Sequence, residues 1–266
     1  MATITCLRRL AHVTTAALHD AVASARLRSF ILGNGPLRRK NKRLISVARF
    51  LIVCGLGRML LELLHIADSA LPIGATAHSF GIETLVEQEN LLPEKVETFL
   101  CDYLCEAGVL EASFVGLAWQ GESPVLLNNE FGARRPSRES RDAALKMGRR
   151  FALLVNALLR VSAIPDSLYY PVAFGLAAAH LQIPKNDTVL AYLRQSISGL
   201  VSACQRLMPI GQVDASCIIW NLKPAVSAAA SMAGADFRIR EVACFTPLPE
   251  LASARHGSLE TRLFIS

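Results

Sequence analysis

The chain has 266 residues, of which 28 are lysine or arginine, 22 are acidic, 52% are apolar and 6% are aromatic. This composition is typical of a globular protein and excludes a disordered chain or a collagen. Seven cysteines, an odd number without a C-x-x-C pair, argue against a disulfide framework or a finger-type zinc site. They favour a reducing compartment, so we expect a cytoplasmic protein.

The net charge of +6 belongs to the beginning of the chain. Residues 1–50 hold ten basic residues and one acidic residue, which leaves 18 basic and 21 acidic residues in 51–266. The larger part is therefore mildly acidic, and we expect no nucleic acid as a partner. We interpret residues 1–58 as a basic N-terminal extension. It is either dispensable or the result of a mis-assigned start of the protein. An organelle transit peptide and a membrane-surface anchor are the alternatives.

Helical periodicity begins at Met59 and dominates to about residue 235, so we predict an all-α fold of about ten helices in one domain, residues 59–266. The first long helix opens at Pro93. Glu111 and other acidic residues lie off its apolar stripe, whose members are three or four residues apart: Val96, Leu100, Tyr103, Ala107, Leu110, Phe114 and Leu117.

Two more amphipathic helices are predicted, one after a Ser137 cap and one after an Asn186 cap. Their apolar faces comprise Ala144, Met147, Phe151, Leu154 and Leu158 in the first, and Leu190, Leu193, Ile197, Leu200, Cys204 and Leu207 in the second.

The uncharged stretch Ser167–Pro184 has the minimum length of a membrane span, but Pro171 near its start favours a buried helix, and we predict no transmembrane segment. Strand signals are nearly absent from the sequence. Only Phe237–Phe245 shows some alternation of apolar and polar residues, which suggests a strand or an extended arm.

Common catalytic motifs are absent from the sequence, so we predict no catalytic residue and no metal site. Cys101 and Cys105 stand four apart in the first long helix. Buried apolar cysteines are the plainer interpretation, and the alternative is a helical metal-binding enzyme or carrier that uses both thiols and a histidine.

Three polar clusters are harder to explain as structure alone. In the first cluster, we expect a helix to stop at Pro72 and the chain to turn at Gly74. The next helix is expected to carry His78 and Glu83. Its small Gly81 would allow the backbone of another element to approach closely. The second, Leu207–Asp214, is either a kink that presents polar groups or an ordinary turn. The third is the terminus, Arg255–Ser266, whose Leu263, Phe264 and Ile265 should be buried in the protein or in a partner.

Together these clusters resemble the UreF family of urease accessory proteins. The resemblance rests on segments that occur in the family's order: Asp68–Gly74, His78–Glu83, Arg138–Arg141 with Met147–Arg149, Pro209–Gln212 with Asp214, and Arg255-His256 with Leu259 and Arg262–Ser266. Ser216 departs from the family, which often has a second glutamine there, and residues 1–58 have no clear counterpart.

The resemblance implies a non-catalytic chaperone that dimerises and bridges UreD (UreH) and the GTPase UreG during nickel insertion into apo-urease. It implies no resident cofactor, because nickel only transits the complex. The partner-binding residues implied are His78, Glu83, Pro209, Gly211, Gln212, Asp214, Arg255, His256, Arg262 and Phe264. The tail itself is expected to be loosely ordered alone and to dock on UreD.

Overall fold

The structure is a computed structural model that describes residues 55–88, 91–234, 239–242 and 246–265. Residues Arg58–Ser266 form one compact unit. Nearly all of the basic segment 1–58 lies outside the described residues, so its role stays a prediction. The strand-like segment Phe237–Phe245 also lies mostly outside them, and its described part contains a 3-10 turn at Ile239–Glu241.

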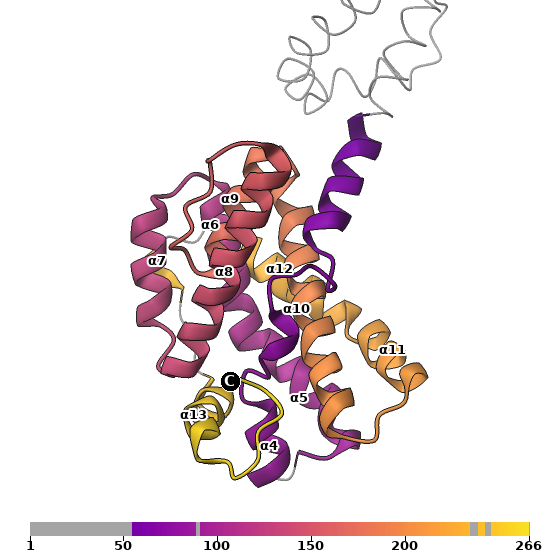
Figure 1. Ribbon diagram of the computed structural model, residues 1–266. Coiled ribbons are helices and arrows are strands. Elements are labelled where there is room, and N and C mark those ends of the chain that lie inside the picture. The colour runs from indigo at the N-terminus through magenta and orange to yellow at the C-terminus, as the bar shows by residue number, and fades with distance from the viewer. Residues whose placement is uncertain (1–54, 89–90, 235–238, 243–245, 266) are drawn as a thin grey trace, which may run out of the picture. The chain divides into compact units, whose positions relative to one another are not determined.

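All regular elements in the described residues are helices (Figure 1). The α-helices are helix 55–66, α4 (Ile82–Gln88), α5 (Val96–Tyr103), α6 (Val109–Trp119), α7 (Pro124–Ala133), α8 (Arg138–Leu159), α9 (Tyr170–His180), α10 (Lys185–Leu207), α11 (Gln212–Asn221), α12 (Lys223–Gly234) and α13 (Pro247–Arg255). Short 3-10 turns lie at Ala75–Ala77, Pro93–Lys95 and His256–Ser258. The all-α prediction of about ten helices is confirmed.

The helix predicted from Pro93 is confirmed, and it contains one irregular turn. A 3-10 turn, α5, a π-helical turn at Leu104–Gly108 and α6 follow one another without a break. All seven residues of the predicted stripe are buried. The spacing of three and four residues does not reveal the π-helical turn, because all members of the apolar stripe remain on the buried side.

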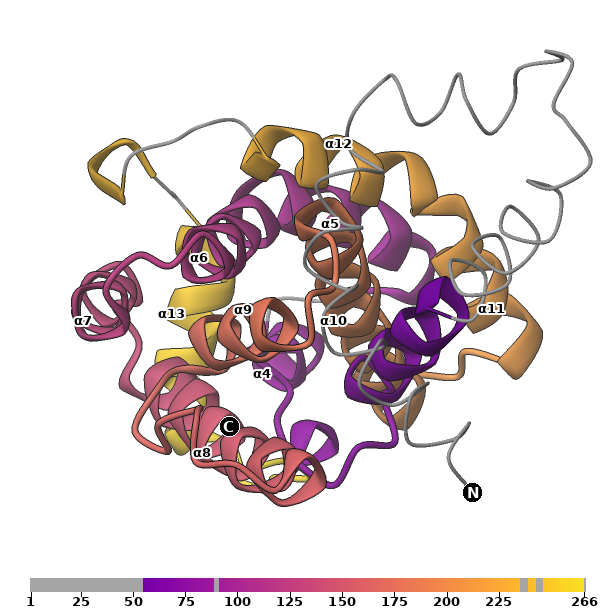
Figure 2. The same ribbon diagram turned by 90° about the horizontal axis from the view of Figure 1, so that it is seen from above.

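Helix α6 forms the centre of the domain, and its residues Leu110–Ala118 are all buried. It packs against α9, α10 and α12 (Figure 2). The contact with α9 depends on Gly175, because a Cβ at this position would lie 2.3 Å from the carbonyl oxygen of Val115. Only glycine lets these two backbones come so close.

Apart from Pro93, the predicted helix starts are right in two of three cases. The Ser137 hydroxyl accepts a hydrogen bond from the Ser140 amide and caps α8, and Pro171 lies in the first turn of α9. Helix α10 begins at Lys185 after Pro184, so the predicted Asn186 cap is wrong. The predicted apolar faces of α8 and α10 are also too long by one residue each, because Leu158 and Leu190 at their ends are exposed.

The uncharged stretch around Pro171 is a buried helix of 11 residues, α9. None of the helices in the described part of the chain has the length and apolar composition needed to span a membrane.

The turn before α4 begins earlier than predicted. The preceding helix ends at residue 66 rather than at Pro72, and Gly74 adopts a left-handed conformation with φ of 83°. The expectation that one helix carries His78 and Glu83 is wrong: His78 is in extended backbone before α4, and Glu83 lies in its first turn.

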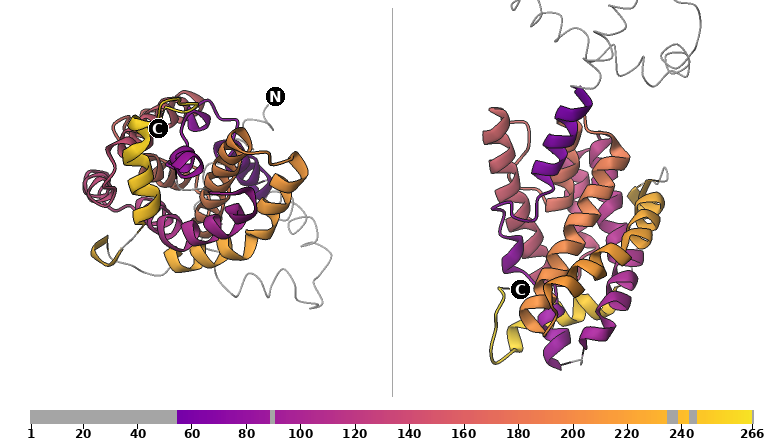
Figure 3. Two further views of the ribbon diagram at one scale, coloured as in Figure 1. Left: turned by 90° about the horizontal axis from the view of Figure 1, so that it is seen from below. Right: turned by 90° about the vertical axis from the view of Figure 1, so that its right-hand side faces the viewer.

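Helix α13 lies across the lower end of the long helices and next to α4 (Figure 3). Gly81, with φ of 90°, permits this contact, because a Cβ there would lie 2.6 Å from the carbonyl oxygen of Pro249. The predicted close backbone approach at Gly81 is therefore confirmed. It brings the C-terminal segment of the chain against α4.

Candidate partner-binding sites

Glu83 is the receptor for the C-terminal segment of its own chain. Its carboxylate is 3% exposed and accepts hydrogen bonds from the backbone amides of Leu263, at 2.5 Å, and Phe264, at 3.2 Å. Nε2 of His256, which is 1% exposed, lies 2.6 Å from the same carboxylate. A buried carboxylate is stable only with such partners. Here all three partners belong to the last eleven residues of the chain.

Two further contacts fix the last residues of the chain, and they come from other elements. The guanidinium of Arg206, in the last turn of α10, lies 4.2 Å from the ring centroid of Phe264 and donates to the carbonyl of Thr76. The Ile265 amide donates to the carbonyl of Ala77 at 2.8 Å. The tail is therefore packed on its own domain in the single chain, contrary to the expectation that it is loosely ordered alone.

Only part of the apolar terminus is buried in this way. Phe264 is 5% exposed, whereas Leu263 and Ile265 are 54% and 64% exposed. Arg255 and Arg262 are also exposed. The docked tail thus offers two large apolar side chains and two cations to the solvent, while His256 and Phe264 anchor it.

His78 lies in a buried, positively charged part of this site. Burial, followed by the nearby charges of Lys146, Arg150 and His256, lowers the pKa of His78 to about 4. The imidazole is therefore neutral in the folded protein at pH 7.

A buried ionic network attaches α13 to the centre of the bundle. Arg135 pairs with Glu111 of α6 and with Glu250 of α13, the latter at 2.8 Å. Glu250 also accepts from the Ser137 amide at 2.9 Å, and Tyr192 donates to Glu111 at 2.9 Å. Burial would lower the pKa of Arg135, but Tyr103 and Glu250 outweigh it and raise that pKa. The guanidinium therefore stays charged.

The periodicity of the sequence does not reveal this network, because it shows only that Glu111 lies off the apolar stripe. Glu111 is the only charged residue between Ala107 and Trp119, and a lone charge in such an apolar run is a usable signal of a buried pair. Arg135 carries no comparable signal, because other charged residues surround it, whereas Glu250 is likewise the only charged residue between Glu241 and Arg255.

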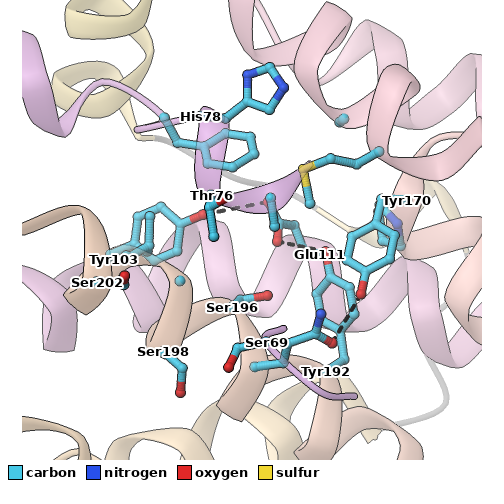
Figure 4. A pocket seen from close by; sticks show the side chains of 18 of the residues that line it. Ser69, Thr76, His78, Tyr103, Glu111, Tyr170, Tyr192, Ser196, Ser198 and Ser202 are labelled. Carbon is cyan, nitrogen blue, oxygen red and sulfur yellow. Dashed lines mark hydrogen bonds between the residues drawn. The ribbon is translucent and has the colours of Figure 1, made fainter. Parts of the chain in front are cut away.

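A cavity of about 220 Å³ lies between the network and the segment before α4 (Figure 4). Figure 4 shows Tyr103 and Tyr192 reaching Glu111 from two sides. Thr76 and His78 form another part of the wall. The segment that binds the tail at Ala77 thus also encloses a hydroxyl-rich space next to buried Glu111.

The second predicted cluster is an interhelical turn rather than a kink. Helix α10 ends at Leu207, and α11 starts at Gln212 with Gly211 as its N-cap. Pro209, Gly211, Gln212 and Asp214 are all exposed. We call Pro209–Asp214 the α10–α11 corner. It begins three residues after Arg206, so it directly follows the turn of α10 that contacts the tail.

The described residues contain no group of three histidine, cysteine or acidic side chains arranged to hold a metal ion. Cys101 is half-buried at the edge of the core and Cys105 is exposed, so the interpretation of both as buried cysteines is wrong for Cys105.

Comparison with known proteins places the chain in a family. The UreF family model matches residues 92–223. The urease accessory protein UreF of a Nostoc strain is 32% identical over 219 residues, which cover 77% of this chain and 95% of the relative. UreF of Bradyrhizobium diazoefficiens is also 32% identical, with 74% and 87% covered. The chain belongs to the UreF family of urease accessory proteins.

Membership in the UreF family agrees with the resemblance drawn from the sequence clusters. UreF of Paenarthrobacter aurescens is 30% identical over 77% of this chain and 97% of its own length. The matched residues 92–223 include the corner, Glu111 and Arg135, but they end before α13 and the tail. Binding of partners by any of the predicted residues stays a prediction.

The low pKa of His78 gives a testable dependence of stability on pH. As the pH falls, the unfolded chain protonates this residue near its ordinary pKa of 6.5, whereas the folded chain resists until about 4, so stability is lost between these values. From pH 7 to pH 5 we expect His78 to account for about 2 kcal/mol of lost unfolding free energy.

Chemical denaturation at both pH values measures this loss. It should be smaller by about that amount in His78→Gln and unchanged in the control His65→Gln, because His65 is exposed. Equal pH dependence in wild type and His78→Gln would show that His78 is not held neutral by the fold.

Proposed function

We propose that this UreF-family chain is a non-catalytic scaffold that acts in the cytoplasm and bridges UreD (UreH) and the GTPase UreG for nickel insertion into apo-urease. The observation that carries the proposal is its similarity to urease accessory proteins over almost their whole length, 95% of the Nostoc relative. Nickel is the cargo of this process.

The docked tail is the proposed surface for UreD. Leu263 and Ile265 are exposed beside Arg262, and Leu248 and Leu251 of α13 are 49% and 56% exposed. Apolar side chains flanked by a cation are typical of a binding surface. Glu83 and His256 are buried under this surface and do not contact UreD in this proposal. They contribute by holding the backbone of the tail in place.

The α10–α11 corner is the proposed surface for UreG. Its proline and glycine set the turn, and Gln212 and Asp214 project from the first turn of α11 together with Val213, which is 75% exposed. Since no core contact requires these polar groups, their replacement should affect binding rather than folding.

Two double variants, each tested against both partners, distinguish the two surfaces. Leu263→Ser with Ile265→Ser should abolish co-purification with UreD, and Gln212→Ala with Asp214→Ala should weaken capture of UreG by the UreD-bound chain. Because all four side chains are exposed, unfolding free energies should stay within about 0.5 kcal/mol of wild type.

Wild-type affinity for UreD in the first variant, or for UreG in the second, would refute the surface concerned. Val125→Ser in α7, which removes an equally exposed apolar side chain, should leave both partners bound.

A second copy of the chain is the proposed occupant of another apolar surface. Within the compact unit, residues 58–66 of the first helix expose three leucines, and in Figures 1 and 2 this part of the helix lies beside α10. A mainly apolar groove of about 250 Å³ lies between α10 and the helices α11 and α12; its wall contains Leu190, Ile197, Ile219 and Val226 together with the cations Arg194 and Lys223. The leucines are Leu60, Leu61 and Leu64, between 56% and 69% exposed. In a two-fold dimer, the helix of each copy can cover the groove of the other.

Light scattering tests this dimer. Leu60→Glu with Leu64→Glu should convert a dimeric wild type into a folded monomer, because it places charges in an apolar interface. Val125→Glu with Leu126→Glu, on the exposed face of α7, is the matched control and should stay dimeric. A wild-type monomer, or a dimeric Leu60/Leu64 variant, would contradict the proposal.

A further inference from the structure

Two thiols lie together on the surface of the helix that runs from Pro93 to Trp119. Cys101 is in the last turn of α5, and Cys105 is in the π-helical turn that follows. They are four residues apart on one continuous helix, so their side chains lie on the same face of it. Cys105 is exposed, and Cys101 is half-buried at the edge of the core. The π-helical turn is itself an irregularity that is found frequently at functional sites.

The charges around the pair favour a cation over a bare thiolate. Burial, then Cys101, Asp102 and Glu106, raise the pKa of the Cys105 thiol. A protonated thiol is a poor nucleophile and oxidises slowly, which argues against a redox sensor. The same negative surroundings stabilise a bound cation, provided that the cation binds sulfur strongly enough to displace the protons.

The number of ligands restricts the class of cation. Structural zinc takes four ligands, and the described residues contain no group of three candidate side chains. Two thiolates alone suit a soft monovalent ion of the Cu(I) class.

We infer that Cys101 and Cys105 form a two-coordinate site for one Cu(I)-class cation. Both S–H bonds break and two S–Cu bonds form, with two protons released to solvent and no change in oxidation state. The inference is independent of the proposed scaffold function, because neither cysteine belongs to the surfaces assigned to UreD, to UreG or to the second copy.

Anaerobic titration of the reduced full chain with Cu(I), in competition with a chromophoric Cu(I) chelator, tests the site. Wild type should retain one equivalent more than Cys101→Ser with Cys105→Ser. The control Cys204→Ser with Cys217→Ser, which also removes one less accessible and one exposed thiol, should keep that equivalent. Comparison by difference removes any contribution from Cys6, Cys54 and Cys244.

The single variant Cys105→Ser keeps the test valid if the double variant fails to fold, because Cys105 is exposed. It should lose the equivalent and the Cu(I)–thiolate absorption in the near ultraviolet. Full retention of the equivalent by Cys105→Ser, or equal binding by wild type and the Cys101/Cys105 double variant, would overturn the inference.

Discussion

The guanidinium of Arg135 connects the centre of the bundle to its C-terminal helix. It lies between Glu111 of α6 and Glu250 of α13, and all three side chains are buried. Burying charges is costly, and the network is stable because each carboxylate has further donors in Tyr192 and the Ser137 amide. Removal of one partner would leave a buried charge unpaired, at about 3–5 kcal/mol. The network therefore fixes the position of α13 on the bundle, because a shift of the helix would separate Glu250 from Arg135.

The position of α13 determines where the tail lies. His256 follows α13 directly, and its imidazole and the amides of Leu263 and Phe264 meet Glu83 on α4. Two buried acidic residues thus hold successive parts of the C-terminal segment: Glu250 holds α13, and Glu83 holds the tail that follows it. The domain and its proposed UreD surface are one folded unit in the isolated chain, so a partner would find this surface already formed.

The sequence predicts the helices well, because local spacing determines them. The stripe from Val96 to Leu117 and the Ser137 cap need only residues within a few turns of one another. The exposed corner at Gln212 and Asp214 also follows from local turn chemistry.

The ionic contacts that build the tail site could not be predicted. Arg135 and Glu250 are 115 residues apart, and His256 and Glu83 are 173 apart. Nothing in the local pattern pairs them, so the sequence does not reveal that Glu83 binds the chain's own tail. Periodicity shows only that Glu111 lies off the apolar stripe, because it reports polarity and not the presence of a buried partner.

Hydrogen exchange at the Leu263 and Phe264 amides tests most directly whether Glu83 holds the tail. Both amides should be protected in wild type and exchange at least about tenfold faster in Glu83→Gln, because a hydrogen bond to a charged acceptor contributes about 1.5–3 kcal/mol. Glu87→Gln, an exposed change on the same helix, should leave the protection unchanged. Unprotected amides in wild type, or equal protection in Glu83→Gln, would contradict the account.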